Sequence, residues 1–256
     1  MTTTQNRKVC WITGASSGIG ATIAQTLAGQ GHVVVLSARG LPALEEAVAR
    51  IRATGGVADA VVVDVTDHAQ VLRAVAEIEA RHGKIDVLVA NAGLNVGARA
   101  WGVVSNTDFD HLIQVNLNGV YYCIDAVLPG MRDRQSGLII NLASWAGKYA
   151  GAKPGPAYTA AKTAVVALTA SLNMSEYVNH IRACAISPGE VATPAMARRI
   201  PPVPEAVLQR MLQPADVAAA VSFVVAMPEH ACINEIILSP TMNAAFGAVP
   251  PPAPAA

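Results

Sequence analysis

Short apolar runs and amphipathic stretches alternate along most of the chain. The run His32–Ser37 is rich in β-branched apolar residues, which is typical of a strand buried on both faces. After it, Leu41, Leu44 and Val48 recur at helical spacing and mark one apolar face. By the same reasoning we expect strands at Val9–Ile12, His32–Ser37, Val57–Val63, Asp86–Ala90, Gly137–Leu142, Ile181–Ser187 and Ile233–Leu238.

Helical patterns fill most of the stretches between these strands. The predicted helices cover about Gly18–Gln30, Leu41–Ile51, Val71–Ile78, Thr107–Asn118, Gly119–Arg134, Tyr158–Val178 and Pro214–Met227. This alternation predicts an α/β fold: a Rossmann-type doubly wound parallel sheet of about seven strands with helices on both faces. No linker or repeat interrupts it. We therefore expect a single domain over 1–247, with a substrate loop at about 194–213 and a flexible Pro/Ala tail at 248–256.

Composition narrows the classes of function. Only 14% of the 256 residues are charged and the formal net charge is zero, which disfavours a nucleic-acid partner and an electrostatic membrane anchor. The nearest approach to a spanning segment, Val217–Met227, is too short, and the polar start Met1–Lys8 lacks the apolar core of an export signal. We therefore expect a cytoplasmic protein.

Cysteine and histidine spacing predicts no metal site. The four cysteines are far apart, contain no Cys-x-x-Cys pair and have apolar neighbours, so we expect reduced core thiols. The six histidines show no ligand spacing either. The cysteines are Cys10, Cys123, Cys184 and Cys232.

A Gly-rich turn joins the first strand to the first helix. Its glycines would let the backbone approach a pyrophosphate, and the helix N-terminus would offer it unpaired N–H groups. Tight strand-to-helix turns also use glycine, which is the plainer alternative. The predicted cofactor-binding residues of this turn are Gly14, Ser16, Ser17, Gly18, Ile19 and Gly20.

The end of the second strand bears on the choice of nicotinamide cofactor. An acid there would accept the ribose 2′-hydroxyl of NAD(H), but no carboxylate appears until Glu45. Arg39 offers a planar charged fork that suits a 2′-phosphate, and Ser37 offers a hydroxyl. We therefore expect NADP(H), with NAD(H) possible. A solvated turn arginine is the alternative.

Tyr158 and Lys162 are four residues apart, which is about one helical turn. A phenol beside an ammonium is a candidate proton donor, because a nearby positive charge favours phenolate. The same spacing occurs by chance in many helices. The competing interpretation is a surface lysine next to a half-buried tyrosine.

Together these residues resemble the short-chain dehydrogenase/reductase family, in its single-domain branch. The likeness covers about Lys8–Leu238, and its motifs occur in the family's order. By this resemblance, Asn116, Ser144, Tyr158 and Lys162 are the catalytic residues. The further cofactor-binding residues that it implies are Asp64 and Val65 at the adenine, Asn91, Ala92 and Gly93 after the fourth strand, and Pro188, Gly189, Val191 and Thr193 at the nicotinamide.

The resemblance implies hydride transfer between nicotinamide and a carbonyl or alcohol carbon. Tyr158 would be the general acid or base, Ser144 would hold the substrate oxygen, and Lys162 would lower the tyrosine pKa and bind the ribose. Asn116 would kink its helix and complete a water relay. The plainer alternatives are a helix-breaking asparagine and a turn serine. The chain departs from the family at its last strand, which lacks an Asp-Gly-Gly ending, and this puts the C-terminal packing in doubt.

Bulky side chains in three loops suggest a mainly apolar substrate. Ordinary packing is the alternative for each bulky residue. Glu190 would favour a cationic substrate, whereas arginines in the loops would favour an acid; solvated loop arginines are the alternative. The candidate wall residues are Trp101, Trp145, Tyr149, Met196 and Met211, and the arginines are Arg99, Arg198 and Arg199.

The stretch Thr163–Ser175 carries no charge on any side, which predicts a homodimer or homotetramer. Cover from another part of the same chain is the alternative.

Two rival functions remain. One is a cofactor-sensing protein without turnover, and the other is an epimerase or dehydratase, for which the chain is short.

Overall fold

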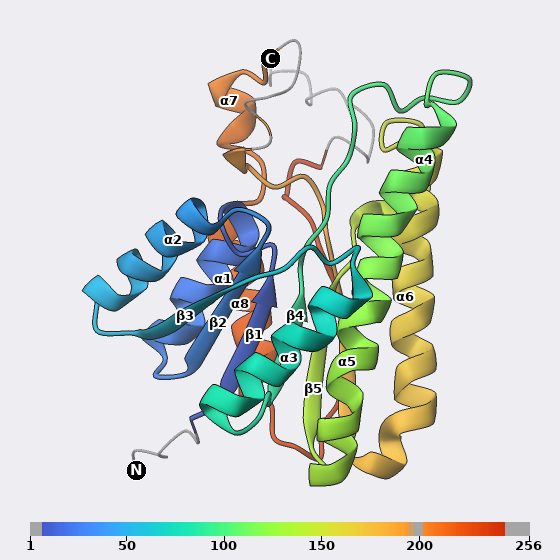
Figure 1. Cartoon of the computed structure of the whole chain (residues 1–256). Helices are drawn as coiled ribbons and strands as arrows, with labels where there is room; N and C mark the ends of the chain where they lie inside the picture. The colour runs from blue at the N-terminus through green and yellow to red at the C-terminus, as the bar shows by residue number, and fades with distance from the viewer. Residues whose placement is uncertain (1–6, 195, 197–201, 244–256) are drawn as a thin grey trace, which may run out of the picture.

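The computed structural model describes residues 7–194, 196 and 202–243. Its centre is a seven-stranded parallel sheet with the order β3-β2-β1-β4-β5-β6-β7 (Figure 1). The predicted fold class is therefore confirmed. The strands are β1 Val9–Thr13, β2 Val33–Ala38, β3 Val57–Val62, β4 Val87–Ala90, β5 Gly137–Leu142, β6 Ile181–Pro188 and β7 Glu235–Leu238.

Helices cover both faces of the sheet. Side chains of β1 alternate between them, since Trp11 and Ile12 are both fully buried but belong to opposite cores. One core lies under α1, α2 and α8, and the other lies under α3, α5 and α6 (Figure 1). The helices are α1 Gly18–Gly29, α2 Leu41–Ala53, α3 His68–His82, α4 Asn106–Ile113, α5 Gly119–Arg134, α6 Pro156–Glu176, α7 Glu205–Leu208 and α8 Pro214–Ala226.

The strand order changes direction at β1. This strand pairs with β2 on one side and with β4 on the other, so the chain crosses the sheet between β3 and β4. In open parallel sheets a ligand crevice lies at such a point, outside the carboxyl ends of the strands. The candidate site should therefore lie beyond the ends of β1 and β4.

Several predicted boundaries are corrected. The helix expected over Thr107–Asn118 ends at Ile113, and a π-helical turn over Gln114–Asn118 joins it to α5. The long helix α6 begins two residues early, at Pro156, because proline suits the first turn of a helix. The short helix α7 has no counterpart among the predictions.

The C-terminal strand is shorter than expected but is paired. β7 begins at Glu235 and runs parallel to β6, with Ala185 opposite Glu235. Cys232 lies in the loop before it and is exposed, so the prediction that all four thiols are buried is wrong for this one. Residues 248–256, Arg198 and Arg199 lie outside the described residues.

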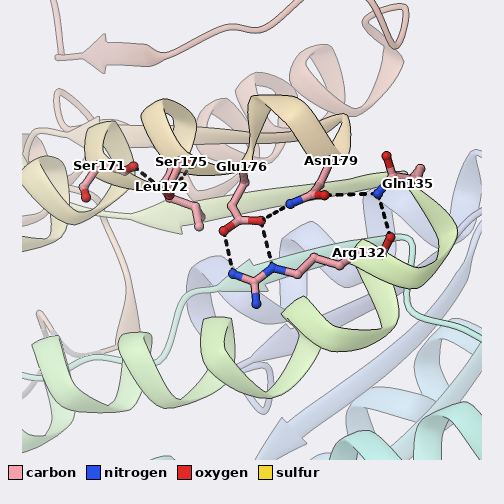
Figure 2. Close-up of polar contacts among 7 residues, drawn as sticks. All are labelled: Arg132, Gln135, Ser171, Leu172, Ser175, Glu176 and Asn179. Atoms are coloured by element: carbon pink, nitrogen blue, oxygen red, sulfur yellow. Dashed lines mark hydrogen bonds and ion pairs between the residues drawn. The ribbon is translucent and has the colours of Figure 1, made fainter.

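A half-buried ion pair ties α5 to the end of α6 (Figure 2). Both oxygens of the buried Glu176 accept from Arg132, at 2.9 Å from Nε and 2.6 Å from Nη2. Nδ2 of Asn179 donates to Glu176 Oε2 at 2.8 Å, and Gln135 donates to Asn179 Oδ1. The hydrogen bonds from Arg132 lower the pKa of Glu176, and the same pairing raises the pKa of Arg132.

Candidate active site

The Gly-rich turn is fastened to the end of β4. Oγ1 of the buried Thr13 accepts hydrogen bonds from the backbone N–H groups of Asn91 and Ala92, both at 3.1 Å. The Asn91 amide in turn donates to the carbonyls of Thr13 and Gly14, at 2.9 and 3.1 Å. Sequence reasoning gave no separate role to Thr13. Its position directly before the first glycine was the available signal.

The glycines of this turn are required by close backbone approach. Gly14 has φ +64°, in the left-handed region. A Cβ at Gly20 would lie 2.5 Å from the Gly14 carbonyl oxygen and 2.6 Å from Asn91 Nδ2, so no side chain fits there. The N-cap residue of α1, Ser17, makes no side-chain capping bond, and the first turn holds no acidic residue. The N–H groups and positive dipole end of α1 therefore suit a phosphate.

Two cofactor contacts were predicted at the end of β2, and the structure is compatible with one of them. Arg39 is exposed and pairs with no other described residue, so its guanidinium is available to a phosphate. Ser37 is only 1% exposed, and its hydroxyl accepts a 2.8 Å hydrogen bond from the Trp11 indole. The prediction that this hydroxyl meets the cofactor is wrong, because the side chain points into the core. The Ser37 carbonyl instead accepts from the N–H of Ala15 and braces the Gly-rich turn.

The segment after β3 forms a compact turn. Oδ1 of Asp64 accepts from the N–H and the hydroxyl of Thr66, at 3.0 and 2.7 Å. Val65 is buried, and a Cβ at Gly119 would lie 2.7 Å from its Cγ2. The contact of Asp64 and Val65 with adenine stays a prediction.

Asn116 lies in the π-helical turn, where a kink was expected. Its Nδ2 donates to the carbonyls of Leu112 and Leu94, both at 2.9 Å, and its Oδ1 accepts from the N–H of Leu94 at 3.2 Å. A Cβ at Gly93 would lie 2.8 Å from Asn116 Oδ1 and 3.4 Å from Lys162 Nζ. Asn116 and Lys162, which are far apart in sequence, therefore meet beside the same glycine.

Tyr158, Lys162 and Ser144 come together beyond the end of β5. Lys162 is 3% exposed, its Nζ donates to the Leu142 carbonyl at 2.7 Å, and Nζ lies 5.8 Å from the centre of the Tyr158 ring. Ser144 hydrogen-bonds the Tyr158 hydroxyl, and its Oγ also accepts from the N–H of Ala146 at 3.2 Å. The catalytic residues implied by the resemblance are thus brought to one place.

Burial is the largest cause of the pKa shifts in this cluster. It lowers the pKa of Lys162 to about 8. It also raises the pKa of Tyr158, an effect that the hydrogen bond from Ser144 partly offsets. The pKa of Tyr158 is therefore raised in this structure and not lowered overall as predicted.

The loop after β6 closes on the Gly-rich turn. The N–H of Gly189 donates to the Leu238 carbonyl at 2.7 Å, and Val191 forms a bridge with Leu212. A Cβ at Gly18 would lie 3.5 Å from Thr193 Cγ2. Two segments that were separately predicted to hold the cofactor therefore lie against each other.

The predicted substrate walls divide into two groups. The rings of Trp145 and Tyr149 lie with their centres 4.3 Å apart and their planes tilted by 32°, in the segment that follows Ser144. Met196 is partly buried. Met211 is buried in the fold, and Trp101 is 83% exposed beside a shallow apolar hollow that includes Phe109 and Pro156. The role of these residues as substrate walls stays a prediction.

Arg99 and Glu190, the described charged residues that were predicted to recognise a substrate, both have protein partners. Arg99 donates to the carbonyls of Lys153 and Val96, at 2.7 and 3.2 Å. Glu190 forms an ion pair with Lys153 at 2.8 Å. Within residues 7–194, 196 and 202–243, no three His, Cys, Asp or Glu side chains gather as a metal site requires, and no helix is both long and apolar enough to span a membrane.

Comparison with known proteins assigns the family. The sequence model of the family described as short chain dehydrogenase matches residues 8–202 of this chain. The chain belongs to this family. An uncharacterized oxidoreductase of Staphylococcus saprophyticus is 37% identical to this short-chain dehydrogenase over 237 residues, covering 91% of the chain and 97% of that protein.

Solved structures of related oxidoreductases share the fold of this short-chain dehydrogenase. The closed form of serine dehydrogenase complexed with NADP+ is 30% identical with a TM-score of 0.84, over 96% of this chain and all of the other. A variant of actinorhodin polyketide ketoreductase with NADPH is 31% identical with a TM-score of 0.81, over 92% of this chain and 97% of the other. A nicotinamide cofactor is consistent with both.

Proposed function

We propose that the protein is an NADP(H)-dependent oxidoreductase that interconverts a mainly apolar carbonyl compound and its secondary alcohol, with Tyr158 as the general acid or base. The observation that carries this proposal is the cluster of Ser144, Tyr158 and Lys162 beyond the end of β5. A bound nicotinamide would supply or accept the hydride, and the Gly-rich turn suits its pyrophosphate.

The side chains of the cluster suit proton transfer at neutral pH. The raised pKa keeps the Tyr158 phenol protonated, so it can donate to a carbonyl oxygen during reduction. Ser144 stabilises negative charge on the same oxygen. The pKa of about 8 leaves Lys162 mostly charged at neutral pH, and its ammonium stabilises the phenolate that remains.

Asn116 has room for one role beyond its backbone bonds. Its two N–H donors are occupied by carbonyls and its oxygen accepts one N–H, which leaves one acceptor position. A water held there would link Lys162 to solvent. This relay is part of the proposal.

Replacing Tyr158 with phenylalanine tests the mechanism, because it keeps the ring and removes only the hydroxyl. NADPH oxidation would be followed by absorbance with a panel of ketones and aldehydes. We expect turnover to fall by about 10²- to 10⁴-fold while NADPH affinity stays the same. Near-wild-type turnover in Tyr158→Phe would refute the mechanism. NADPH binding without oxidation by any carbonyl would favour the sensor.

The preference for NADP(H) rests on the exposed Arg39. Affinities for NADPH and NADH would be measured for the wild type and for Arg39→Ala, with Arg73→Ala as a control on the exposed side of α3. We expect the preference for NADPH to disappear only in Arg39→Ala, since a 2′-phosphate contact is charge-assisted. An unchanged preference would point to an NAD(H)-dependent enzyme or to another phosphate site.

The outer face of α6 supports a homodimer or homotetramer. Met174 and Tyr177 are strongly exposed at its end, and the exposed positions Thr163 to Ser175 carry no charge. Met174→Glu should shift the mass measured by light scattering toward the monomer, whereas a monomeric wild type would refute the proposal.

The free thiols of Cys10 and Cys123 support the predicted cytoplasmic location.

A further inference from the structure

Basic residues gather at the amino ends of neighbouring strands, on the edge of the sheet opposite the candidate active site. Lys8 directly precedes β1, Lys84 lies shortly before β4, and His180 directly precedes β6. Arg182 follows within β6 itself. Because these strands are parallel and lie in the order β1-β4-β5-β6, their amino ends meet at one edge, at the bottom of Figure 1. Cations that are far apart in the sequence therefore share one surface.

A cavity of about 240 Å³ lies at this edge. This volume is several times the ~30 Å³ that one water occupies in the liquid, and it is somewhat below the roughly 300 Å³ at which pockets for small molecules begin. A small polyatomic ion therefore fits. The basic lining residues are Arg7, Lys8, Lys84, Arg134, His180 and Arg182, and the acidic ones are Asp86 and Glu229.

The positive charge of this cavity is only partly compensated. Asp86 is already engaged, since its Oδ1 lies 2.9 Å from Lys84 Nζ and its Oδ2 accepts the N–H of Val9 at 2.8 Å. Among the residues that the structure describes, the side chains of Arg7 and Lys8 form no hydrogen bond or ion pair. The rest of the chain contains no aspartate or glutamate, so no further carboxylate side chain exists to pair with them.

Backbone carbonyls orient two arginines of the cavity. Nη1 of Arg182 donates to the Ala231 carbonyl at 2.7 Å, and Nη2 of Arg134 donates to the Ile85 carbonyl at 2.8 Å. Glu79 also faces Arg134, at a longer 3.6 Å. A carbonyl fixes a guanidinium without cancelling its charge, and the five N–H donors of a guanidinium leave some for a ligand. These two arginines are therefore held in place before any ligand binds.

We propose that this cavity is a binding site for a small anion that carries phosphate groups, separate from the cofactor site at the carboxyl edge. A guanidinium matches two phosphate oxygens with two parallel N–H donors, and the ammonium groups add charge. Glu229 is exposed and offsets part of this charge, but the five permanent cations outnumber the two carboxylates. The cations repel one another, and a bound anion relieves that repulsion. The inference does not rest on the proposed function.

Calorimetric titration with inorganic pyrophosphate tests the proposal, in a phosphate-free buffer of low salt. The protein is first saturated with NADPH, so that the probe cannot occupy the Gly-rich turn. We expect one pyrophosphate per chain, with a dissociation constant on the order of 1 mM or below, and weaker binding of orthophosphate. Because the cations are partly exposed, 0.5 M salt should weaken binding by about 10-fold or more.

Substitutions in the cavity locate the site. The double variant Arg7→Gln and Lys8→Gln removes two cations whose side chains hold no other described residue. It should raise the dissociation constant by about 10-fold or more and leave the unfolding midpoint of the unliganded protein unchanged. Arg182→Gln should weaken binding by a similar factor. The control, Arg50→Gln with Arg73→Gln, removes the same charge from the exposed sides of α2 and α3, and should change the constant by less than about twofold.

Thermal unfolding gives a second measurement. At ten times its dissociation constant, pyrophosphate should raise the midpoint of the wild type by about 3–6 °C, because it binds only the folded protein. This rise should be lost in Arg7→Gln with Lys8→Gln and kept in the control. No binding at 10 mM pyrophosphate, or equal binding in the wild type, this double variant and Arg182→Gln, would overturn the proposal. Pyrophosphate binding that NADPH abolishes would overturn it too, since the probe would then occupy the cofactor site.

The same experiment separates this inference from the proposed function. A protein that does not bind NADPH would count against the proposed function alone. In that case the effect of the two cavity variants on pyrophosphate binding still decides the inference, because neither variant alters the Gly-rich turn.

Discussion

Replacing Glu176 with glutamine should destabilise the protein by about 2 kcal/mol. The substitution keeps the shape of the side chain but removes its charge and places an amide N–H₂ opposite a guanidinium donor. Fully exposed ion pairs contribute about 0–1 kcal/mol, and breaking a fully buried pair costs about 3–5 kcal/mol. The Glu176 side chain is 6% exposed and that of Arg132 is 48% exposed, so this pair lies between these limits (Figure 2).

The assay is thermal unfolding at pH 7, repeated at several protein concentrations because an oligomer stabilises by mass action. For a chain of this size, about 2 kcal/mol corresponds to a midpoint about 4–8 °C lower. Glu46→Gln is the matched control. Its partner, Arg50, is one turn along α2 and both side chains are more than half exposed. The control should shift the midpoint by less than about 2 °C.

The stability difference between the wild type and Glu176→Gln should also depend on pH. The pKa of Glu176 is lower in the folded protein than the ordinary 4.5, so its contribution to stability is complete above about 4.5. It is lost as the pH falls through the folded-state pKa. The gap between the wild type and Glu176→Gln should therefore be constant from pH 6 to 8 and narrow in acid. A gap that is absent at pH 7, or that is equal in Glu46→Gln, would refute the reasoning.

Three other substitutions test the site. Gly20→Ala should weaken NADPH binding by about 10-fold or more, because its Cβ would meet the Gly14 carbonyl oxygen at 2.5 Å, whereas Gly29→Ala, with open space around it, should not. Lys162→Met should abolish activity yet raise the unfolding midpoint at pH 7 by about 2–5 °C, and this gain should vanish toward pH 10 because the lysine with a folded-state pKa of about 8 is then neutral in the native protein. A gain that persists at pH 10 would contradict that pKa. Ser37→Ala should leave NADPH affinity unchanged but cost about 1–3 kcal/mol in unfolding free energy, because the Trp11 indole loses its acceptor; weaker NADPH binding would restore the predicted cofactor role.

Most of the fold was predictable because its signals are local. The apolar run of β2 and the spacing of Leu44 and Val48 reflect neighbours within one strand or one turn. Boundaries were less predictable where a terminus depends on a contact elsewhere. The turn at Gln114–Asn118 is one case, since Asn116 there bonds to Leu94, a residue of another loop. The exposed position of Cys232 depends likewise on where β7 begins to pair with β6.

In the candidate site, too, local spacing predicted some features and distant contacts determined others. The Gly-rich turn and the Tyr158–Lys162 pair were visible because each is a short spacing with a physical meaning. The role of Ser37 was not, because a residue at the end of a strand can point to a ligand or into the core, and only the packing of Trp11 decides between them. No motif indicated Lys153, whose partner is 37 residues away.

By itself, then, the sequence determined the alternation of strands and helices, the Gly-rich turn and the catalytic helix, since these depend on residues near one another in the chain. Tertiary structure decided which distant side chains share an environment. It buried Lys162 beside Leu142, which lowers the pKa of its ammonium to about 8, and it brought Lys153 to Glu190. Hydrogen bonding and desolvation depend on atoms within a few ångströms in space, and their effects therefore appear only when the segments pack together.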